Sequence, residues 1–156
     1  MKRNIVLLSL AIFSIFLGSQ ITEGCLLVPY WKSLSTTEFY TYFSKFGPIV
    51  GKFYTVLTII AALIPISISV YCFRKKSTAL KHSLLSTLFT VLFIAFFYIY
   101  FKGANLQFYN TAYNTEQLKA ELITWEYLHW CRVLLEFLAL IFLLKTVNII
   151  INKKVQ

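Results

Sequence analysis

The stretch ELITWEYLHWCRVLLEFLALIFLLKTV, residues 121–147, is the segment that decides how this chain folds. It is apolar and long enough to enter a membrane, because a helix needs about 20 predominantly apolar residues to span the hydrocarbon core. Its first half carries four aromatic or ionisable side chains at intervals of four, three and four residues: Trp125, His129, Arg132 and Glu136. On an α-helix this spacing places all four on one stripe. We therefore expect a membrane helix whose polar stripe faces other helices.

The polar stripe has two interpretations. Charged side chains near the bilayer centre cost about 2.5–3.5 kcal/mol each on insertion, so they normally face the bundle interior and find partners. In a structural interpretation, Arg132 and Glu136 form an i,i+4 ion pair, and His129 hydrogen-bonds a neighbouring helix. In a functional interpretation, the acid, the base and the cation form a site, which is the usual hypothesis for ionisable groups inside a membrane. The sequence leaves both open.

The composition indicates an integral membrane protein. Of the 156 residues, 58% are hydrophobic and 13% are charged, whereas soluble domains average about 45–50% apolar and about 25% charged residues. The net charge of +9 does not indicate nucleic-acid binding, because the basic residues form short clusters at the ends of apolar runs. This is the distribution that orients membrane proteins, with Lys and Arg on the cytoplasmic side. We expect the partner of this chain to be the lipid bilayer, and no nucleic acid.

Four apolar runs predict an all-α, up-and-down bundle of four transmembrane helices in a single domain. They cover residues 4–22, 53–73, 83–101 and 121–147. Lys2 and Arg3 before the first run also suit a cleavable signal peptide, but no clean cleavage site follows, so we expect a retained helix. The basic loop 74–81 and the pair Lys153-Lys154 predict that both termini are cytoplasmic, in a multi-pass protein of the cell membrane.

A short interfacial helix is expected between the first two transmembrane helices. Ser35 precedes Glu38 by three residues, which is the signature of a capping box at a helix N-terminus. Aromatic side chains follow at helical spacing, at Phe39, Tyr42, Phe43 and Phe46. Gly47-Pro48 then predicts the end of this helix. Its aromatic stripe is typical of a helix that lies in the membrane interface.

The expected topology brings the first and last helices together in one polar pocket near the outer leaflet. Glu23 ends the first helix on the side where His129 and Arg132 enter the last. If the helices touch, four side chains converge: Glu23, Glu126, His129 and Arg132. A carboxylate beside an imidazole fixes the tautomer that acid–base catalysis requires, and an arginine holds an anionic intermediate. Trp125 adds a flat apolar surface for a planar ligand.

A metal or a bound cofactor is not expected. His82 opens the third helix on the cytoplasmic side, whereas His129 lies in the outer half of the fourth. Because most of a bilayer about 30 Å thick separates them, the two share no metal or haem within one chain. The three cysteines form no CxxC motif.

Three segments resemble a known family: TEGCLLVPYWKSLSTTEFYTYFSKFGP from Thr22, ANLQFYN at 104–110 and WEYLHWCR at 125–132. They are similar to segments of small bacterial four-helix membrane proteins related to the anthrone oxygenase-like family, mostly of unknown function. A few fungal relatives oxidise anthrones to anthraquinones with molecular oxygen and no evident cofactor. The resemblance implies that His129 abstracts a proton from an activated carbon, that Arg132 stabilises the anion, and that Asn105 helps to line the pocket.

Two functions therefore stand side by side. The first is a cofactor-independent, oxygenase-like oxidoreductase, with His129, Arg132 and Glu23 as catalytic residues. Its substrate is a small apolar or aromatic molecule that contacts Asn105, Trp125 and Glu126. The second is a non-enzymatic membrane protein that binds a lipid or a protein partner through its aromatic outer segment, at Tyr40, Tyr42 and Phe43. The sequence does not decide between them, and it leaves the oligomeric state open.

Overall fold

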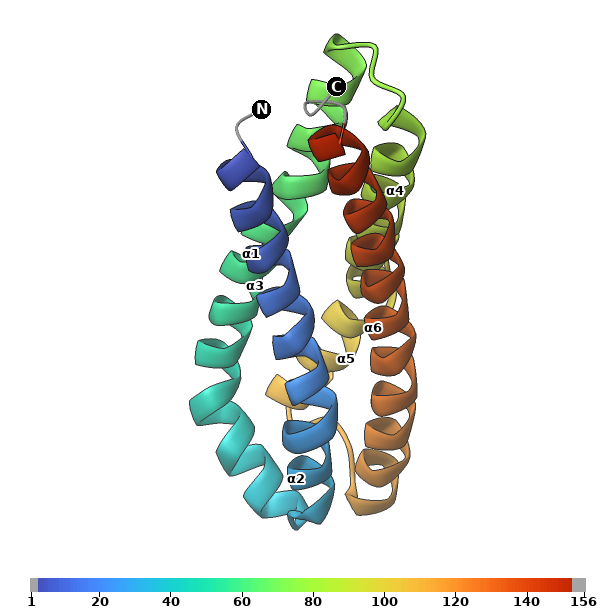
Figure 1. Cartoon of the computed structure of the whole chain (residues 1–156). Coiled ribbons are helices and arrows are strands. Elements are labelled where there is room, and N and C mark those ends of the chain that lie inside the picture. The colour runs from blue at the N-terminus through green and yellow to red at the C-terminus, as the bar shows by residue number, and fades with distance from the viewer. Residues whose placement is uncertain (1–2, 153–156) are drawn as a thin grey trace.

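The computed structural model describes residues 3–152 and is all-helical (Figure 1). Its elements are α1 (Arg3–Thr22), the π-helical turn η1 (Glu23–Leu27), α2 (Val28–Ser33), α3 (Thr36–Arg74), α4 (Leu80–Phe96), the π-helical turn η2 (Phe97–Phe101), α5 (Lys102–Tyr109) and α6 (Thr115–Asn152). Because η1 joins α1 to α2 and η2 joins α4 to α5, these elements form four continuous helical columns. The basic residues Lys2, Lys153 and Lys154 lie outside the described part of the chain.

All four columns are long and apolar enough to cross a membrane. They are Arg3–Ser33, Thr36–Arg74, Leu80–Tyr109 and Thr115–Asn152. The chain is thus a multi-pass membrane protein with four candidate spans, and the predicted all-α fold with four long helices is confirmed. The two ends of the described chain and the turn between α3 and α4 lie at one end of the bundle (Figure 1). The side of the membrane on which this end lies stays a prediction.

The prediction of a separate interfacial helix is wrong. The capping box forms as expected, with the Ser35 amide donating to Glu38 Oε2 at 2.8 Å and the Glu38 amide donating to Ser35 Oγ at 3.4 Å. The helix that begins there is α3 itself, which continues through Gly47 and Pro48. Proline removes one backbone hydrogen bond, but a helix inside a bundle is held mainly by the packing of its buried face. Phe43, 6% exposed, supplies that packing just before the proline.

The helical columns are longer than a bilayer is thick. The 38 residues of α6 extend about 57 Å at 1.5 Å per residue, against about 30 Å for the hydrocarbon core. The polar part of this extra length lies at the end of the bundle opposite the termini. Residues 102–109, which follow the predicted end of the third apolar run, are helical there and do not form a connecting loop. We call this end the cap: α2, residues 36–47 of α3, α5, and residues 115–127 of α6.

Two separate apolar cores hold the bundle together. The membrane core lies among α1, α3, α4 and α6, and its buried members include Phe13, Phe16, Ile68, Phe93 and Leu143. The cap core is strongly aromatic, and its members include Trp31, Phe39, Phe43, Phe108 and Trp125. Its rings meet mostly edge to face, the favoured geometry for aromatic pairs. The stripe predicted on the last helix lies where these two cores meet.

Candidate functional site

A layer of buried polar side chains separates the two apolar cores. We call it the polar layer, and its members are Gln20, Glu23, His129, Arg132 and Glu136, with exposed fractions of 1, 7, 0, 8 and 1%. Phe16 of the membrane core lies one turn before Gln20, and Trp125 of the cap core lies one turn before His129. The first and last helices therefore do meet, and Glu23, His129 and Arg132 are buried in one layer.

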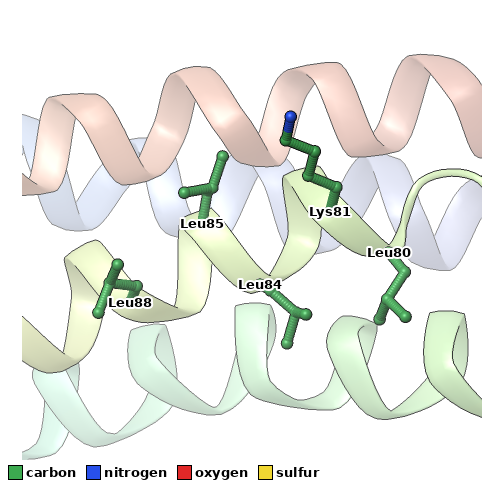
Figure 2. Close-up of a pocket in the computed structure, with 5 residues that line it drawn as sticks. All are labelled: Leu80, Lys81, Leu84, Leu85 and Leu88. Atoms are coloured by element: carbon green, nitrogen blue, oxygen red, sulfur yellow. The ribbon is translucent and has the colours of Figure 1, made fainter.

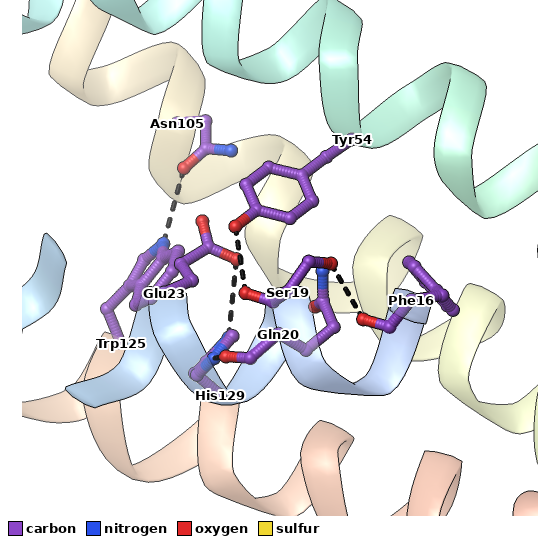
Figure 3. A network of polar contacts seen from close by, with 8 residues as sticks. All are labelled: Phe16, Ser19, Gln20, Glu23, Tyr54, Asn105, Trp125 and His129. Atoms are coloured by element: carbon purple, nitrogen blue, oxygen red, sulfur yellow. Dashed lines mark hydrogen bonds and ion pairs between the residues drawn. The ribbon is translucent and has the colours of Figure 1, made fainter. Parts of the chain in front are cut away.

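The hydrogen bond of His129 identifies its tautomer. Nε2 lies 2.9 Å from the backbone carbonyl oxygen of Gln20 (Figure 3). Because a carbonyl oxygen only accepts hydrogen bonds, Nε2 carries the proton and Nδ1 of the neutral ring is the free base. This Nδ1 is buried, has no hydrogen-bond partner, and lies 3.9 Å from Glu23 Oε2. The Trp125 ring stacks on the imidazole with centroids 5.1 Å apart and planes at 12°.

A π-helical turn and a glycine bring Glu23 to His129. Glu23 is the first residue of the π-helical turn η1. Such turns are rare in proteins, but those that occur are frequently found at functional sites. Gly24 follows, and a Cβ there would lie 2.9 Å from Trp130 Cζ2 and 3.1 Å from His129 Cδ2. Only glycine therefore lets η1 approach α6 this closely without displacing a ring. The Glu-Gly pair after the first apolar run is the sequence signal for this contact.

Arg132 is a buried cation with no carboxylate in direct contact. Its guanidinium carbon lies 4.5 Å from the ring centroid of Phe93 and 4.4 Å from that of Phe101. Within residues 3–152, the ion pairs shorter than 4.0 Å are Lys32–Glu126 and His129–Glu23. The i,i+4 ion pair of the structural interpretation is thus not formed as a direct contact. Arg132 Nε and both carboxylate oxygens of Glu136 are buried without hydrogen-bond partners, and Glu23 and Glu136 attract Arg132 at longer range.

The predicted substrate-binding residues separate into two groups. Trp125 Nε1 donates to Asn105 Oδ1 at 3.3 Å, which brings α5 to the cap side of the polar layer (Figure 3). Glu126 lies outside the layer, because Lys32 Nζ contacts its Oε2 at 2.6 Å in a partly exposed ion pair. It is the one predicted site residue that the structure does not bring to the others.

Sequence reasoning missed two neighbours of the site. Gln20 supplies the backbone acceptor for His129, and its side-chain Oε1 is buried without a partner. Its position one turn before Glu23, inside an apolar run, is the signal that was available. Tyr54 of α3 donates to the Ser19 carbonyl at 3.1 Å, and its ring lies beside the Glu23 carboxylate (Figure 3). Nothing in the sequence pairs Tyr54 with α1, because that contact is tertiary.

Two grooves on the bundle lie away from the polar layer. One is lined by Leu80, Lys81, Leu84, Leu85 and Leu88 (Figure 2). The other is lined by Ile49, Lys52, Phe53, Val56, Leu57 and Ile60. Both open to the outside of the bundle and are almost wholly aliphatic or aromatic. Across the described residues, no three His, Cys, Asp or Glu side chains are grouped so as to hold a metal ion.

Comparison with known proteins adds no relative to this picture. No family model, no curated protein and no solved structure matches the chain. The resemblance to the anthrone oxygenase-like family therefore depends on the three sequence segments alone.

Proposed function

We propose that this chain is an oxygenase-like membrane enzyme that removes a proton from an activated carbon of a small, lipid-soluble aromatic substrate. The observation that carries the proposal is the free Nδ1 of His129, which is buried, has no hydrogen-bond partner and lies beside Glu23. A general base must offer a lone pair within reach of the substrate proton, and burial removes water that would compete for it. Gln20 and Trp125 hold the ring in place.

Arg132 is suited to stabilise the anion that this step creates. Its guanidinium packs over the rings of Phe93 and Phe101 and is not neutralised by a direct carboxylate contact. A preorganised cation in a water-excluded site stabilises developing negative charge far better than the same cation in water. An aromatic substrate that spreads its charge onto a phenolate oxygen would offer that oxygen to Arg132.

The proposed reaction converts a CH₂ group and molecular oxygen into a carbonyl group and water. His129 Nδ1 takes the first proton, and the resulting carbanion is delocalised toward Arg132. This anion transfers electrons to O₂ and forms a C–O bond, and the proton returns to give a hydroperoxide. Loss of the second C–H proton then breaks the O–O bond, which leaves C=O and releases water. O₂ is the oxidant, and the resemblance is what suggests it.

The test is oxygen uptake by the purified chain in lipid nanodiscs, with a hydroxyanthrone as probe substrate. We expect His129→Ala to lower the protein-dependent rate by about 10²–10⁴-fold, the usual contribution of a general base, and added imidazole to restore part of it. His82→Ala is the matched control, because His82 lies in the first turn of α4, far from the polar layer, and stacks on Phe142. Turnover by His129→Ala at the wild-type rate would overturn the proposal.

A stability measurement separates this site from a structural ion cluster. Residues held for activity often cost little stability on removal, whereas breaking a buried ion pair costs about 3–5 kcal/mol. We expect Arg132→Met to stay within about 1 kcal/mol of the wild type in detergent. Phe108→Ala, in the cap core, is the positive control and loses about 3–5 kcal/mol. An equal loss for Arg132→Met would favour the structural interpretation.

The alternative is a non-enzymatic protein that binds a lipid or a protein through the outer aromatic segment. Phe43 packs on Phe108, and Tyr40 donates to the Tyr113 carbonyl at 2.9 Å. Tyr42 is half-buried, packs against the cap core and stacks on Phe46. A co-purifying partner that Tyr42→Ala releases and His129→Ala retains would favour this alternative.

A further inference from the structure

Besides Arg3, five cations lie at the end of the bundle that carries both ends of the described chain. They are Arg74, Lys75, Lys76, Lys81 and Lys145, and all are exposed. The Lys145 ammonium lies 5.4 Å from the Phe142 ring, which stacks on His82, the neighbour of Lys81. Within residues 3–152 none of the five forms an ion pair shorter than 4.0 Å. We call this group the basic cluster; its positive charge has no acidic side chain to balance it.

One member of the basic cluster occupies a backbone position that favours glycine. Lys76 has a φ of 48°, in the left-handed region that costs a non-glycine residue about 1–2 kcal/mol. The Lys76 amide donates to the Phe73 carbonyl at 3.1 Å, and the Ser77 amide donates to the Cys72 carbonyl at 2.9 Å. These two bonds form the Schellman motif that ends α3, in which glycine usually takes the place of Lys76. The chain thus carries a cation where uncharged glycine would be more stable.

An aliphatic groove of about 590 Å³ begins at the basic cluster and runs along α4, with α6 on one side and α3 on the other (Figure 2). Leu80, Leu84 and Leu88 recur every four residues and line about 12 Å of helix at 1.5 Å per residue. Leu84 and Leu88 are 53% and 50% exposed. The groove therefore has an apolar lining along α4 and positive charge at one end. These two features match the acyl chain and the head group of an acidic lipid.

We propose that this groove binds one anionic phospholipid, with the phosphate on the basic cluster and an acyl chain along residues 80–88. A zwitterionic lipid brings its own cation and leaves the basic cluster unbalanced, so charge selects an acidic head group. Basic pockets between membrane helices commonly recognise such head groups. The groove along residues 49–60 provides an internal comparison. Each groove is lined by one lysine, but Lys81 belongs to the basic cluster and Lys52 does not.

Native mass spectrometry of the full chain in detergent tests the proposal, with phosphatidylglycerol and phosphatidylcholine of identical acyl chains as probes. We expect phosphatidylglycerol to bind at least about tenfold more tightly, since each cation near a membrane surface adds about 1 kcal/mol of attraction. The triple variant Lys75→Gln, Lys76→Gln, Lys81→Gln removes three cations and should remove this preference, so that phosphatidylglycerol binding weakens by at least about tenfold, to the phosphatidylcholine level. Lys52→Gln is the matched control and leaves both affinities unchanged.

Two further arms test the acyl chain and the source of the anion. Leu84→Ala with Leu88→Ala should weaken both lipids by a similar factor, because it removes apolar lining without changing charge. Equal affinity for the two lipids, or an equal loss in Lys52→Gln, overturns the proposal. So does full displacement of the lipid by inorganic phosphate, which would mean that the basic cluster binds a free anion. None of these results depends on the oxygenase activity, so the two proposals fail separately.

Discussion

At the scale of single residues, the capacity of each group to donate or accept decides what the polar layer can do. The Gln20 carbonyl only accepts, so it commits His129 to one tautomer and leaves Nδ1 free. Arg132 has two aromatic rings where a structural ion pair would have a carboxylate. Spacing placed His129, Arg132 and Glu136 on one stripe correctly, but the identity of each partner comes from another helix.

Thr111 is the residue at which a substitution should stabilise the protein. It has a φ of 52°, and a β-branched side chain is disfavoured in this region. The Thr111 and Ala112 amides donate to Phe108 and Gln107 at 3.3 and 3.1 Å, as in a Schellman motif. Thr111→Gly removes a conformational cost of about 1–2 kcal/mol and adds about 0.5–1 kcal/mol of backbone entropy cost. We expect a net gain of about 0.5–1 kcal/mol.

Thermal unfolding in detergent measures this gain. Ala112→Gly is the control, because Ala112 does not have a positive φ and its replacement should cost stability. A loss for Thr111→Gly as large as that for Ala112→Gly would show that the left-handed conformation carries no penalty here.

At the scale of the elements, the boundaries of the helices follow local signals only where packing agrees with them. Ser35 and Glu38 start α3 as their spacing predicts. Gly47 and Pro48 have the composition of a helix end, yet they lie inside α3, because the cap core holds the segment before them and the membrane core holds the segment after them. The low helix propensity of Gly47 and Pro48 therefore costs less free energy than is gained by packing the buried helix faces before and after them.

The close contact between η1 and α6 makes opposite predictions for two glycines. A Cβ on Gly24 would lie 2.9 Å from Trp130, whereas a Cβ on Gly18 would meet nothing within 4 Å. Gly24→Ala should therefore cost about 1–3 kcal/mol through overpacking and displace His129. Gly18→Ala should gain about 0.5–1 kcal/mol, because alanine loses less conformational entropy than glycine when the helix forms. Denaturant unfolding of both variants measures the difference, and equal effects would mean that η1 and α6 are not in close contact.

At the scale of the whole molecule, the bundle has a membrane part, a polar layer and an aromatic cap. The exposed cations at the terminal end have no acidic neighbours, whereas Glu38, Glu116, Glu121 and Glu126 all lie near the cap. This asymmetry is the basis for placing the terminal end in the cytoplasm. With this orientation, we expect the polar layer to lie toward the outer leaflet.

Cysteine labelling tests this orientation. In a variant with Cys25, Cys72 and Cys131 replaced by serine, single cysteines are introduced as Thr78→Cys or Asn110→Cys, both at exposed turn positions. An impermeant maleimide added to sealed right-side-out vesicles should label Asn110→Cys only, and label Thr78→Cys after permeabilisation. The reverse pattern would invert the orientation, and labelling of both in sealed vesicles would contradict four crossings.

The sequence by itself determined the class of the protein, the four long helices and the stripe on the last one. Those features depend on composition and on the 3.6-residue period, which are properties of neighbouring residues along the chain. Only the tertiary structure decided that α3 is continuous, that Glu126 pairs with Lys32 outside the layer, and that Arg132 packs over Phe93 and Phe101. Each of these depends on contacts between helices far apart in sequence. Such contacts outweigh local turn signals because burying a helix face is worth more than a single backbone hydrogen bond.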